Sequence, residues 1–214
     1  MCKKHFFKMI YILSLLMILN SCVVSRYIKK NFIGCYDGTP TGIDTLLDLS
    51  GYFLKSPNFS DKNGSCLSGC QFLVFYNDGM VFRGEWTSLF GNCNTFIQRH
   101  FYKAYPDRLN GVEWGLYKLT NNIIKVQFVE PGSPGSQGYS SIVRYKVIDR
   151  HTIQEVIGFD LEGRPSNIEV VDIYRFVPID KLPPSDCWLK SKKWFWCNEE
   201  MYMKYKQNLK NEKI

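Results

Sequence analysis

The sequence predicts an all-β fold, an antiparallel up-and-down barrel of about eight strands followed by a short C-terminal helix. Short runs rich in β-branched and aromatic residues alternate with turn-forming residues through most of the chain. Before residue 187, no run of ten or more residues has the periodicity of an amphipathic helix, which argues against alternating strands and helices. Successive hairpins of this kind favour a barrel, because closure removes the exposed edges of a sheet.

Turn signals divide the expected strands into hairpins. The clearest is Asn77-Asp78-Gly79, and a second tight turn is expected at Thr120-Asn121-Asn122. Residues 56–69 and 130–138 are expected to be loops because they are rich in Gly, Ser, Asn and Pro. The expected strands span residues 48–55, 71–76, 80–86, 112–119, 123–129, 139–148, 152–159 and 168–177, with a weaker strand at 96–103.

Aromatic residues make up 15% of the chain and recur within the expected strands. This predicts large rings pointing into the barrel from several strands. The rings fit either a packed aromatic core, the favoured alternative, or a cavity that holds one small ligand. Trp86, Trp114 and Tyr117 are the strand residues predicted to contact a ligand or partner. The aromatic residues that recur within the expected strands are Phe72, Phe75, Tyr76, Phe82, Trp86, Trp114, Tyr117 and Phe128.

Two motifs in this region carry a resemblance to a known family. Asp48-x2-Gly51-x-Phe53 opens the first expected strand, and Trp114-Gly115-x-Tyr117 precedes a tight hairpin. With the meander order and the helix after the last strand, the chain resembles the lipocalin-like barrels found on bacterial lipoproteins, roughly over residues 48–177. The barrel domain is accordingly expected at 48–178. The resemblance implies binding of a small apolar or amphipathic ligand, or a structural role in the cell envelope; fold alone does not decide between them.

The N-terminus predicts a lipoprotein signal peptide. Three lysines, at positions 3, 4 and 8, precede the apolar stretch Met9–Leu19, which is too short to span a membrane. The following Leu19-Asn20-Ser21-Cys22 resembles the lipobox of bacterial lipoprotein precursors. This resemblance implies that residues 1–21 are removed, that Cys22 is acylated, and that residues 22–47 form a lipidated linker. The expected partner is therefore the membrane, through a lipid anchor.

No acidic residue follows Cys22 in Val23-Val24-Ser25-Arg26. By resemblance to lipoproteins of bacteria with two membranes, this implies retention on the periplasmic face of the outer membrane. Six cysteines besides Cys2 and Cys22 then lie in an oxidising compartment, where disulfides persist. These candidates are Cys35, Cys66, Cys70, Cys93, Cys187 and Cys197.

Six cysteines allow fifteen connectivities, which the sequence leaves open. Cys66 with Cys70 and Cys187 with Cys197 are close enough for local bridges, leaving Cys35 for Cys93. A metal site is not expected, because there is no C-x2-C pair and both histidines of the mature chain are distant from any cysteine pair.

The segment 179–214 is expected to pack against the barrel as an aromatic-rich addition. Trp188, Trp194 and Trp196 are predicted to plug one end or to cover the outer wall, held by a Cys187–Cys197 bridge. The alternative is an exposed patch for a partner or a glycan. Asn198 is expected to cap a helix that continues through Gln207.

Charge and motifs exclude several function classes. Removal of the three signal-peptide lysines lowers the formal charge from +7 to +4, and the excess lies in the lysine-rich tail after Cys187. The tail is expected to be a solvated helix surface, with contact to anionic lipid headgroups as an alternative. A near-neutral barrel argues against nucleic-acid binding. No nucleophile, phosphate-loop or metal motif is present, so neither enzymatic activity nor a cofactor is expected.

The sequence thus leaves two function classes open. One is a binding protein for a small apolar or amphipathic ligand. The other is a structural or assembly lipoprotein that binds another protein and has no ligand cavity.

Overall fold

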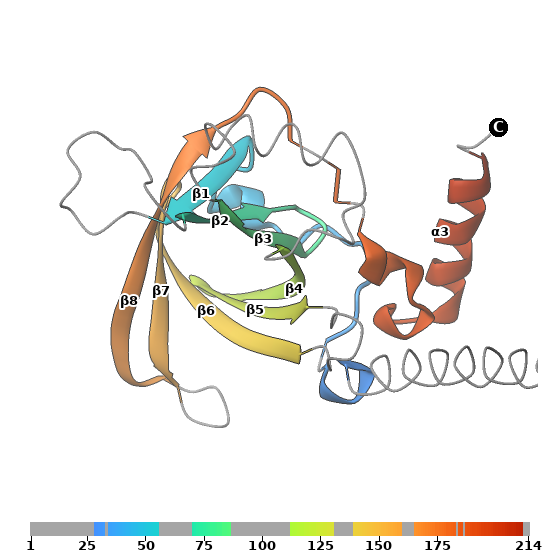
Figure 1. Cartoon of the computed structure of the whole chain (residues 1–214), viewed down its shortest axis with the longest axis horizontal. Helices are drawn as coiled ribbons and strands as arrows, with labels where there is room; N and C mark the ends of the chain where they lie inside the picture. Colours follow the sequence, from blue (N-terminus) through green and yellow to red (C-terminus); the bar gives the residue numbers. More distant parts are fainter. Residues whose placement is uncertain are drawn as a thin grey trace, which may run out of the picture.

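The chain forms a closed antiparallel barrel of eight strands (Figure 1). In this computed structural model, residues 28–32, 34–55, 70–86, 112–130, 139–159, 165–182, 184–185 and 187–211 are described. Each strand pairs with the next one along the chain, and β8 pairs with β1 to close the ring. The predicted lipocalin-like, up-and-down barrel with a short C-terminal helix is therefore confirmed.

The strand bounds agree with the predicted ones to within one residue, except at two strand starts. The strands are β1 (Gly51–Lys55), β2 (Cys70–Phe75), β3 (Met80–Trp86), β4 (Val112–Thr120), β5 (Ile123–Glu130), β6 (Tyr139–Asp149), β7 (Thr152–Phe159) and β8 (Pro165–Pro178). The helical elements are η1 (Ile43–Thr45), η3 (Trp188–Ser191), η4 (Lys193–Phe195) and α3 (Glu199–Asn211). The weaker strand expected at 96–103 and the loop expected at 56–69 lie outside the described residues. So does the loop expected at 130–138, apart from Glu130, which ends β5.

The first strand begins three residues later than predicted because Asp48 forms a local turn. Its carboxylate accepts hydrogen bonds from the backbone N–H of Ser50 at 2.9 Å and from the Ser50 hydroxyl at 2.6 Å. These bonds hold the pKa of Asp48 below its usual range. A side chain that bonds its own neighbouring backbone competes with strand pairing, so the ladder starts at Gly51.

Both predicted tight turns are present. Gly79 has a φ of 89° in the turn between β2 and β3, and its N–H donates to the Tyr76 carbonyl at 3.2 Å. Asn121 has a φ of 55° in the two-residue turn between β4 and β5. Glycine and asparagine tolerate this left-handed backbone best, which is why these residue types predicted the turns.

Buried side chains form two clusters, one inside the barrel and one on its outer wall. Phe75, Tyr117 and Phe128 belong to the inner cluster, so large rings point inward from several strands, as predicted. Phe72, Phe82 and Trp114 belong to the outer cluster. Successive side chains along a strand point to opposite faces of the sheet. Residues three positions apart, such as Phe72 and Phe75, therefore lie on different faces. Tyr76 packs against the outer cluster.

The N- and C-terminal segments cover this outer cluster together. Tyr36 forms a parallel bridge with Trp196, and its N–H donates to the Phe195 carbonyl at 2.8 Å. The Tyr36 ring stacks on Phe195 with centroids 5.5 Å apart. The C-terminal aromatic residues therefore pack on the outer wall, one of the two positions expected for them.

Helix α3 begins at its predicted cap and lies outside the barrel (Figure 1). The Asn198 side chain accepts a hydrogen bond from the N–H of Met201 at 2.8 Å, which confirms the cap. The helix ends at Asn211 rather than Gln207 and buries none of its residues. Among the described residues, no helix is long and apolar enough to cross a membrane.

Closure of the barrel between β1 and β8 depends on the absence of a side chain at Gly51. A Cβ atom there would lie 2.1 Å from the Val177 carbonyl oxygen. We expect Gly51→Ala to lower the free energy of unfolding by about 2–3 kcal/mol, because backbone rather than a flexible side chain must move. Urea unfolding followed by circular dichroism measures this, with Lys125→Ala on an exposed strand position as the control. An unchanged midpoint for Gly51→Ala would contradict the expectation.

Candidate functional site

The barrel interior is apolar at one end, which the N-terminal segment closes. Ile43 in η1 and Leu47 are fully buried in the inner cluster. The segment is fixed to two turns at this end, because the Thr41 N–H donates to the Asn77 carbonyl at 2.8 Å and the Arg150 guanidinium donates to the Asp44 carbonyl at 3.2 Å. Buried side chains fill the interior above this plug. They include Phe53, Phe75, Tyr117, Ile124, Val126, Phe128, Val147 and Ile153.

Polar side chains replace apolar ones toward the opposite end. Arg83 on β3 and Glu113 on β4 form a cross-strand ion pair, with the Arg83 Nε donating to Glu113 Oε2 at 2.7 Å. The guanidinium lies 4.1 Å from the centroid of the Phe128 ring. The Tyr139 hydroxyl donates to the other carboxylate oxygen of Glu113 at 3.0 Å. Both members of the pair are nearly buried, with side-chain exposures of 14% and 11%.

The electrostatics of this pair follow from its burial. Burial alone would lower the pKa of the Arg83 guanidinium, but the Glu113 carboxylate, together with Tyr145 and Tyr174, outweighs that effect and raises the pKa. The guanidinium therefore remains charged. Because it also lies on the Phe128 ring, it gains a cation–π contact in a partly desolvated environment.

A second polar group lies on β2, β7 and β8. The Tyr174 hydroxyl contacts the side-chain oxygen of Gln71 at 2.5 Å and the Glu155 carboxylate at 3.1 Å. Burial, the neighbouring Tyr145 and then Glu155 raise the pKa of Tyr174 far above its usual range, so its hydroxyl stays protonated. The Tyr145 ring meets Tyr174 edge-on, with centroids 5.6 Å apart.

An ion pair between Lys55 on β1 and Asp172 on β8, at 2.7 Å, extends the polar groups toward the rim. We call the whole set the polar layer; it comprises Lys55, Gln71, Arg83, Glu113, Tyr139, Tyr145, Glu155, Asp172 and Tyr174. In these residues, two cationic side chains face three carboxylates. The described part of the layer is therefore slightly acidic.

The polar layer lies toward the end of the barrel where β1, β3, β5 and β7 finish. Glu113 is the second residue of β4 and Gln71 the second of β2. The connections at this end span residues 56–69, 87–111, 131–138 and 160–164, which are outside the described residues. The interior thus offers hydroxyl, carboxylate, amide and guanidinium groups above an apolar, closed base. That combination suits an amphipathic molecule.

The structure brings Trp194 and Trp196 together at one pocket but does not gather the strand candidates into one site. Tyr117 lies inside, near the closed end, where its hydroxyl is 2.6 Å from Thr41 Oγ1. Trp114 is buried on the outer wall with its ring centroid 5.0 Å from that of Phe82. Only the backbone of Trp86 is described, in β3. Trp188, Trp194 and Trp196 are half-buried against the outer cluster.

Sequence reasoning missed the polar layer because it considered large rings in the interior and assigned no face to Arg83 or Glu113. In the structure, Phe82 and Trp114 lie on the outer wall, and alternation along the strands places Arg83 and Glu113 inside. One signal could have found this arrangement. If the aromatic-rich terminal segment covers the outer wall, that wall needs apolar residues to pack against.

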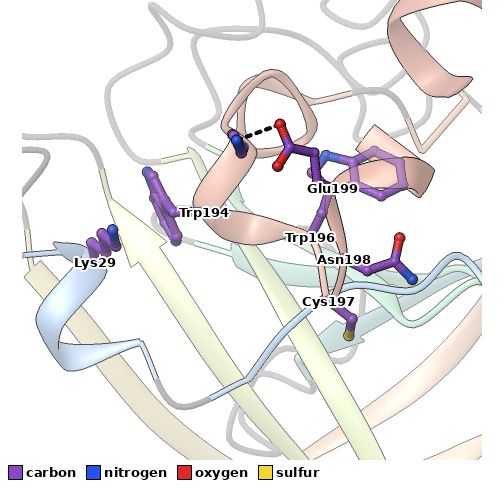
Figure 2. Close-up of a pocket in the computed structure, with 7 residues that line it drawn as sticks. Lys29, Trp194, Trp196, Cys197, Asn198 and Glu199 are labelled. Carbon is purple, nitrogen blue, oxygen red and sulfur yellow. Dashed lines mark hydrogen bonds and ion pairs between the residues drawn. The ribbon is translucent and has the colours of Figure 1, made fainter. Parts of the chain in front are cut away.

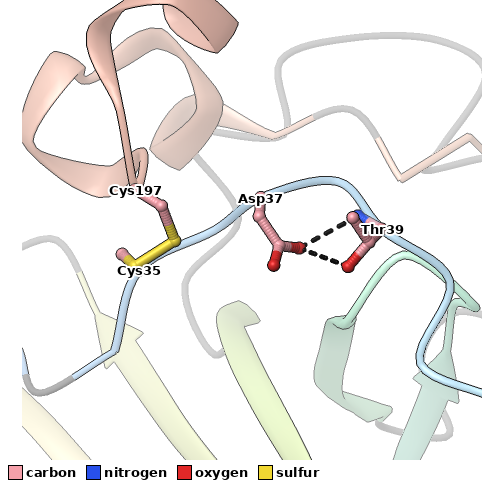
Figure 3. Close-up of a disulfide and its surroundings, with 4 residues drawn as sticks. All are labelled: Cys35, Asp37, Thr39 and Cys197. Carbon is pink, nitrogen blue, oxygen red and sulfur yellow. Dashed lines mark hydrogen bonds between the residues drawn. A yellow bond between two sulfur atoms is a disulfide. The ribbon is translucent and has the colours of Figure 1, made fainter.

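The disulfide joins Cys35 to Cys197, with Cα atoms 4.8 Å apart (Figure 3). The expected local bridge between Cys187 and Cys197, and the expected pairing of Cys35 with Cys93, are therefore wrong. Loop length favoured the local bridge, but the backbone bonds of Tyr36 with Phe195 and Cys197 align the two terminal segments and place Cys35 beside Cys197. The Cys187 side chain is buried in the outer cluster.

The remaining cysteine predictions stay predictions. Cys22, Cys66 and Cys93 lie outside the described residues, and only the backbone of Cys70 is described. A turn next to the disulfide is held by Asp37, whose carboxylate accepts bonds from the Thr39 N–H at 2.9 Å and hydroxyl at 2.7 Å (Figure 3). Among the described residues, no group of three His, Cys, Asp or Glu side chains could hold a metal ion.

The C-terminal segment is also fixed to the barrel through Asp78 in the turn between β2 and β3. Its carboxylate accepts bonds from Lys190 Nζ at 3.0 Å and from the Ser185 hydroxyl at 2.7 Å. The Tyr36 hydroxyl donates to the same oxygen at 2.9 Å. Burial would raise the pKa of Asp78, but Lys190 and these hydroxyls outweigh it and lower the pKa.

This network predicts a pH dependence. Because the pKa of Asp78 is lower in the folded state, its stabilising effect is complete above the unfolded value of about 3.9 and is lost as pH falls through the folded value. We expect wild type to be more stable than Asp78→Asn at neutral pH, and the difference to shrink in acid. Urea unfolding across this pH range measures it. A difference independent of pH would show that Asp78 contributes no charge effect.

No protein-family model, curated protein or solved structure matches this chain.

Proposed function

We propose that the chain is a lipid-anchored extracytoplasmic binding protein that holds a small amphipathic ligand at the polar end of its barrel. The observation that carries the proposal is the change along the barrel axis from a filled apolar base to the polar layer. Small closed barrels that bind one ligand do so at their mouths, where a few polar groups fix its orientation.

The charge of the polar layer favours one kind of ligand. Arg83 is neutralised by Glu113 and Lys55 by Asp172, which leaves the carboxylate of Glu155 in contact with only the Tyr174 hydroxyl among the described contacts. A carboxylate headgroup would meet this acidic surplus and be repelled. A neutral polyol or a cationic headgroup would accept or donate hydrogen bonds there.

Binding of simple amphiphiles tests this proposal. We expect titration calorimetry to detect dodecyl maltoside or dodecyltrimethylammonium below their micellar concentrations, and laurate much more weakly. Glu155→Gln should weaken the cationic probe selectively, whereas Glu200→Gln on exposed helix α3 should leave all three unchanged. Equal or tighter binding of laurate would refute the assignment of ligand class. No binding of any probe would refute the ligand site.

The proposed anchor is the lipid on Cys22. The Cys35–Cys197 disulfide supports an extracytoplasmic location, because such bonds persist in oxidising compartments. Cys22→Ser should abolish fatty-acid labelling and release a soluble or uncleaved form, and unchanged labelling would refute the anchor. We further propose the periplasmic face of the outer membrane; digestion of the protein by protease added to intact cells would exclude that face.

A second candidate function, assembly with another envelope protein, is favoured by the exposed end of the β7–β8 ribbon. β1 pairs only with residues 174–178 of β8, so the first half of β8 has β7 as its partner among the described pairs (Figure 1). Four apolar residues of this end of the ribbon are about half exposed: Ile157 on β7 and Ile168, Val170 and Val171 on β8. A photo-crosslinker at position 170 should then give a protein adduct in intact cells that the same probe at Lys125 does not. Identical patterns would exclude this function.

A further inference from the structure

The N-terminal and C-terminal segments form one continuous surface beside the disulfide. Lys29, from the first, lines a pocket of about 400 Å³ with Trp194 and Glu199, from the second (Figure 2). The Cys35–Cys197 bond holds the two segments together. We call the described residues 28–32 and 192–211 the anchor-side surface.

The position of this surface follows from the chain length to Cys22. Six peptide steps separate Cys22 from Ile28, and an extended chain of that length spans at most about 20 Å. Any lipid on Cys22 therefore keeps the start of the anchor-side surface close to the headgroups of the bilayer. The barrel is attached to this surface through the outer cluster, in which Ile28 itself is buried.

The charge of this surface is opposite to that of anionic phospholipids. It carries seven exposed lysines against two exposed glutamates, Glu199 and Glu200. One of the lysines, Lys193, is paired with Glu199 at 2.5 Å. The seven are Lys29, Lys30, Lys192, Lys193, Lys204, Lys206 and Lys210. The polar layer of the barrel is acidic, so the positive charge is concentrated on the anchor-side surface.

Its apolar residues are of the kinds that enter a membrane interface. Trp194 is half-buried at the edge of the pocket, beside Lys29. Met203 on α3 is 49% exposed, and the helix has no buried residue that would commit it to the barrel core. Tryptophan and lysine are the side chains that headgroup regions accommodate best, because each combines an apolar body with a polar end.

We propose that the anchor-side surface lies on the anionic headgroups of the bilayer, with Trp194 at the level of the interface and the lysines on lipid phosphates. This inference rests on the proposed lipid anchor. It adds a second contact to the anchor, so that the domain has a fixed orientation on the membrane rather than rotating about a flexible tether.

The test uses the full protein purified with its lipid and reconstituted into vesicles whose acyl chains are brominated. Bromine quenches tryptophan only at short range. We expect Trp fluorescence to be quenched in vesicles of phosphatidylcholine with phosphatidylglycerol, and much less in phosphatidylcholine alone. High salt should abolish this difference, because it screens the attraction between the lysines and the anionic headgroups. Trp194→Phe should remove most of the salt-sensitive part of the fluorescence quenching.

Matched charge variants separate local from overall charge. Lys29→Gln, Lys30→Gln and Lys204→Gln together should abolish the salt-sensitive quenching. The control triple, Lys118→Gln, Lys125→Gln and Lys146→Gln, removes the same charge from the barrel wall and should retain it. Equal loss in both triples would overturn the proposal.

Other outcomes also decide the question. Protein that floats with the vesicles but shows no lipid-dependent quenching refutes the surface and leaves the anchor intact. Protein that floats with neither vesicle refutes the anchor and the surface together. Cross-linking of Trp194-proximal lysines into a dimer, with Trp194 protected from bromine, would assign the surface to a second copy instead.

Discussion

Replacing Arg83 by methionine is expected to lower the free energy of unfolding by about 3–5 kcal/mol, because it leaves the Glu113 carboxylate buried without its cation. The side chain of Glu113 is only 11% exposed, so water cannot solvate it in place of Arg83. The Tyr139 hydroxyl alone is a weaker partner for a charged group. Urea unfolding followed by circular dichroism gives the loss.

The double variant Arg83→Met, Glu113→Met is the decisive comparison. Both charges are then absent, and neither desolvation penalty remains. We expect it to recover most of the stability that the single variant loses. If the double variant is as unstable as the single one, the stability loss comes from the packing that Arg83 makes on Phe128 and not from the unpaired charge of Glu113.

Replacing Cys35 by serine is expected to cost about 4–5 kcal/mol, the value that chain entropy gives for a bond of such long separation. The two cysteines are 162 positions apart. Without the bond, the terminal segments keep their backbone pairing, the stacking of Tyr36 on Phe195 and the Asp78 network. The barrel signal in circular dichroism should persist while tryptophan emission shifts to the red. The thermal midpoint, compared with that of wild type under oxidising and reducing conditions, measures the effect.

The control is Cys187→Ser, which should leave the Cys35–Cys197 cross-link in place. Peptide mapping under non-reducing conditions identifies the pair directly. Cys197 joined to Cys187, or Cys35 joined to Cys93, would contradict the structure. Wild type and Cys35→Ser having the same midpoint would show that the bond constrains little in the unfolded chain.

The strands and turns were predictable because their signals are local. Asn77-Asp78-Gly79 and Asn121-Asn122 fix two hairpins through backbone conformations that few other residues adopt, and strand lengths follow from the turns on either side. The sequential order then left a closed meander as the arrangement without exposed edges. The start of β1 differs from the predicted one for a visible local reason. The Asp48 side chain accepts a hydrogen bond from the nearby backbone N–H of Ser50.

The faces of the strands and the disulfide were not predictable in the same way. Both faces of β2 to β4 carry aromatic rings, so alternation alone gives no inside or outside. The choice depends on the terminal segments, which come together only in the folded chain through Tyr36 and Trp196. The polar layer of the candidate site and the Cys35–Cys197 pair are consequences of that long-range contact.

The Cys35–Cys197 bond also determines what proteolysis can release. A single cut anywhere between these residues leaves two fragments that remain covalently joined. If the proposed lipid anchor is present, a single cut sheds the barrel only where it falls before Cys35, and a cut after Cys35 sheds it only once the bond is also reduced. A molecule with one such nick would then stay attached until the local redox potential changes.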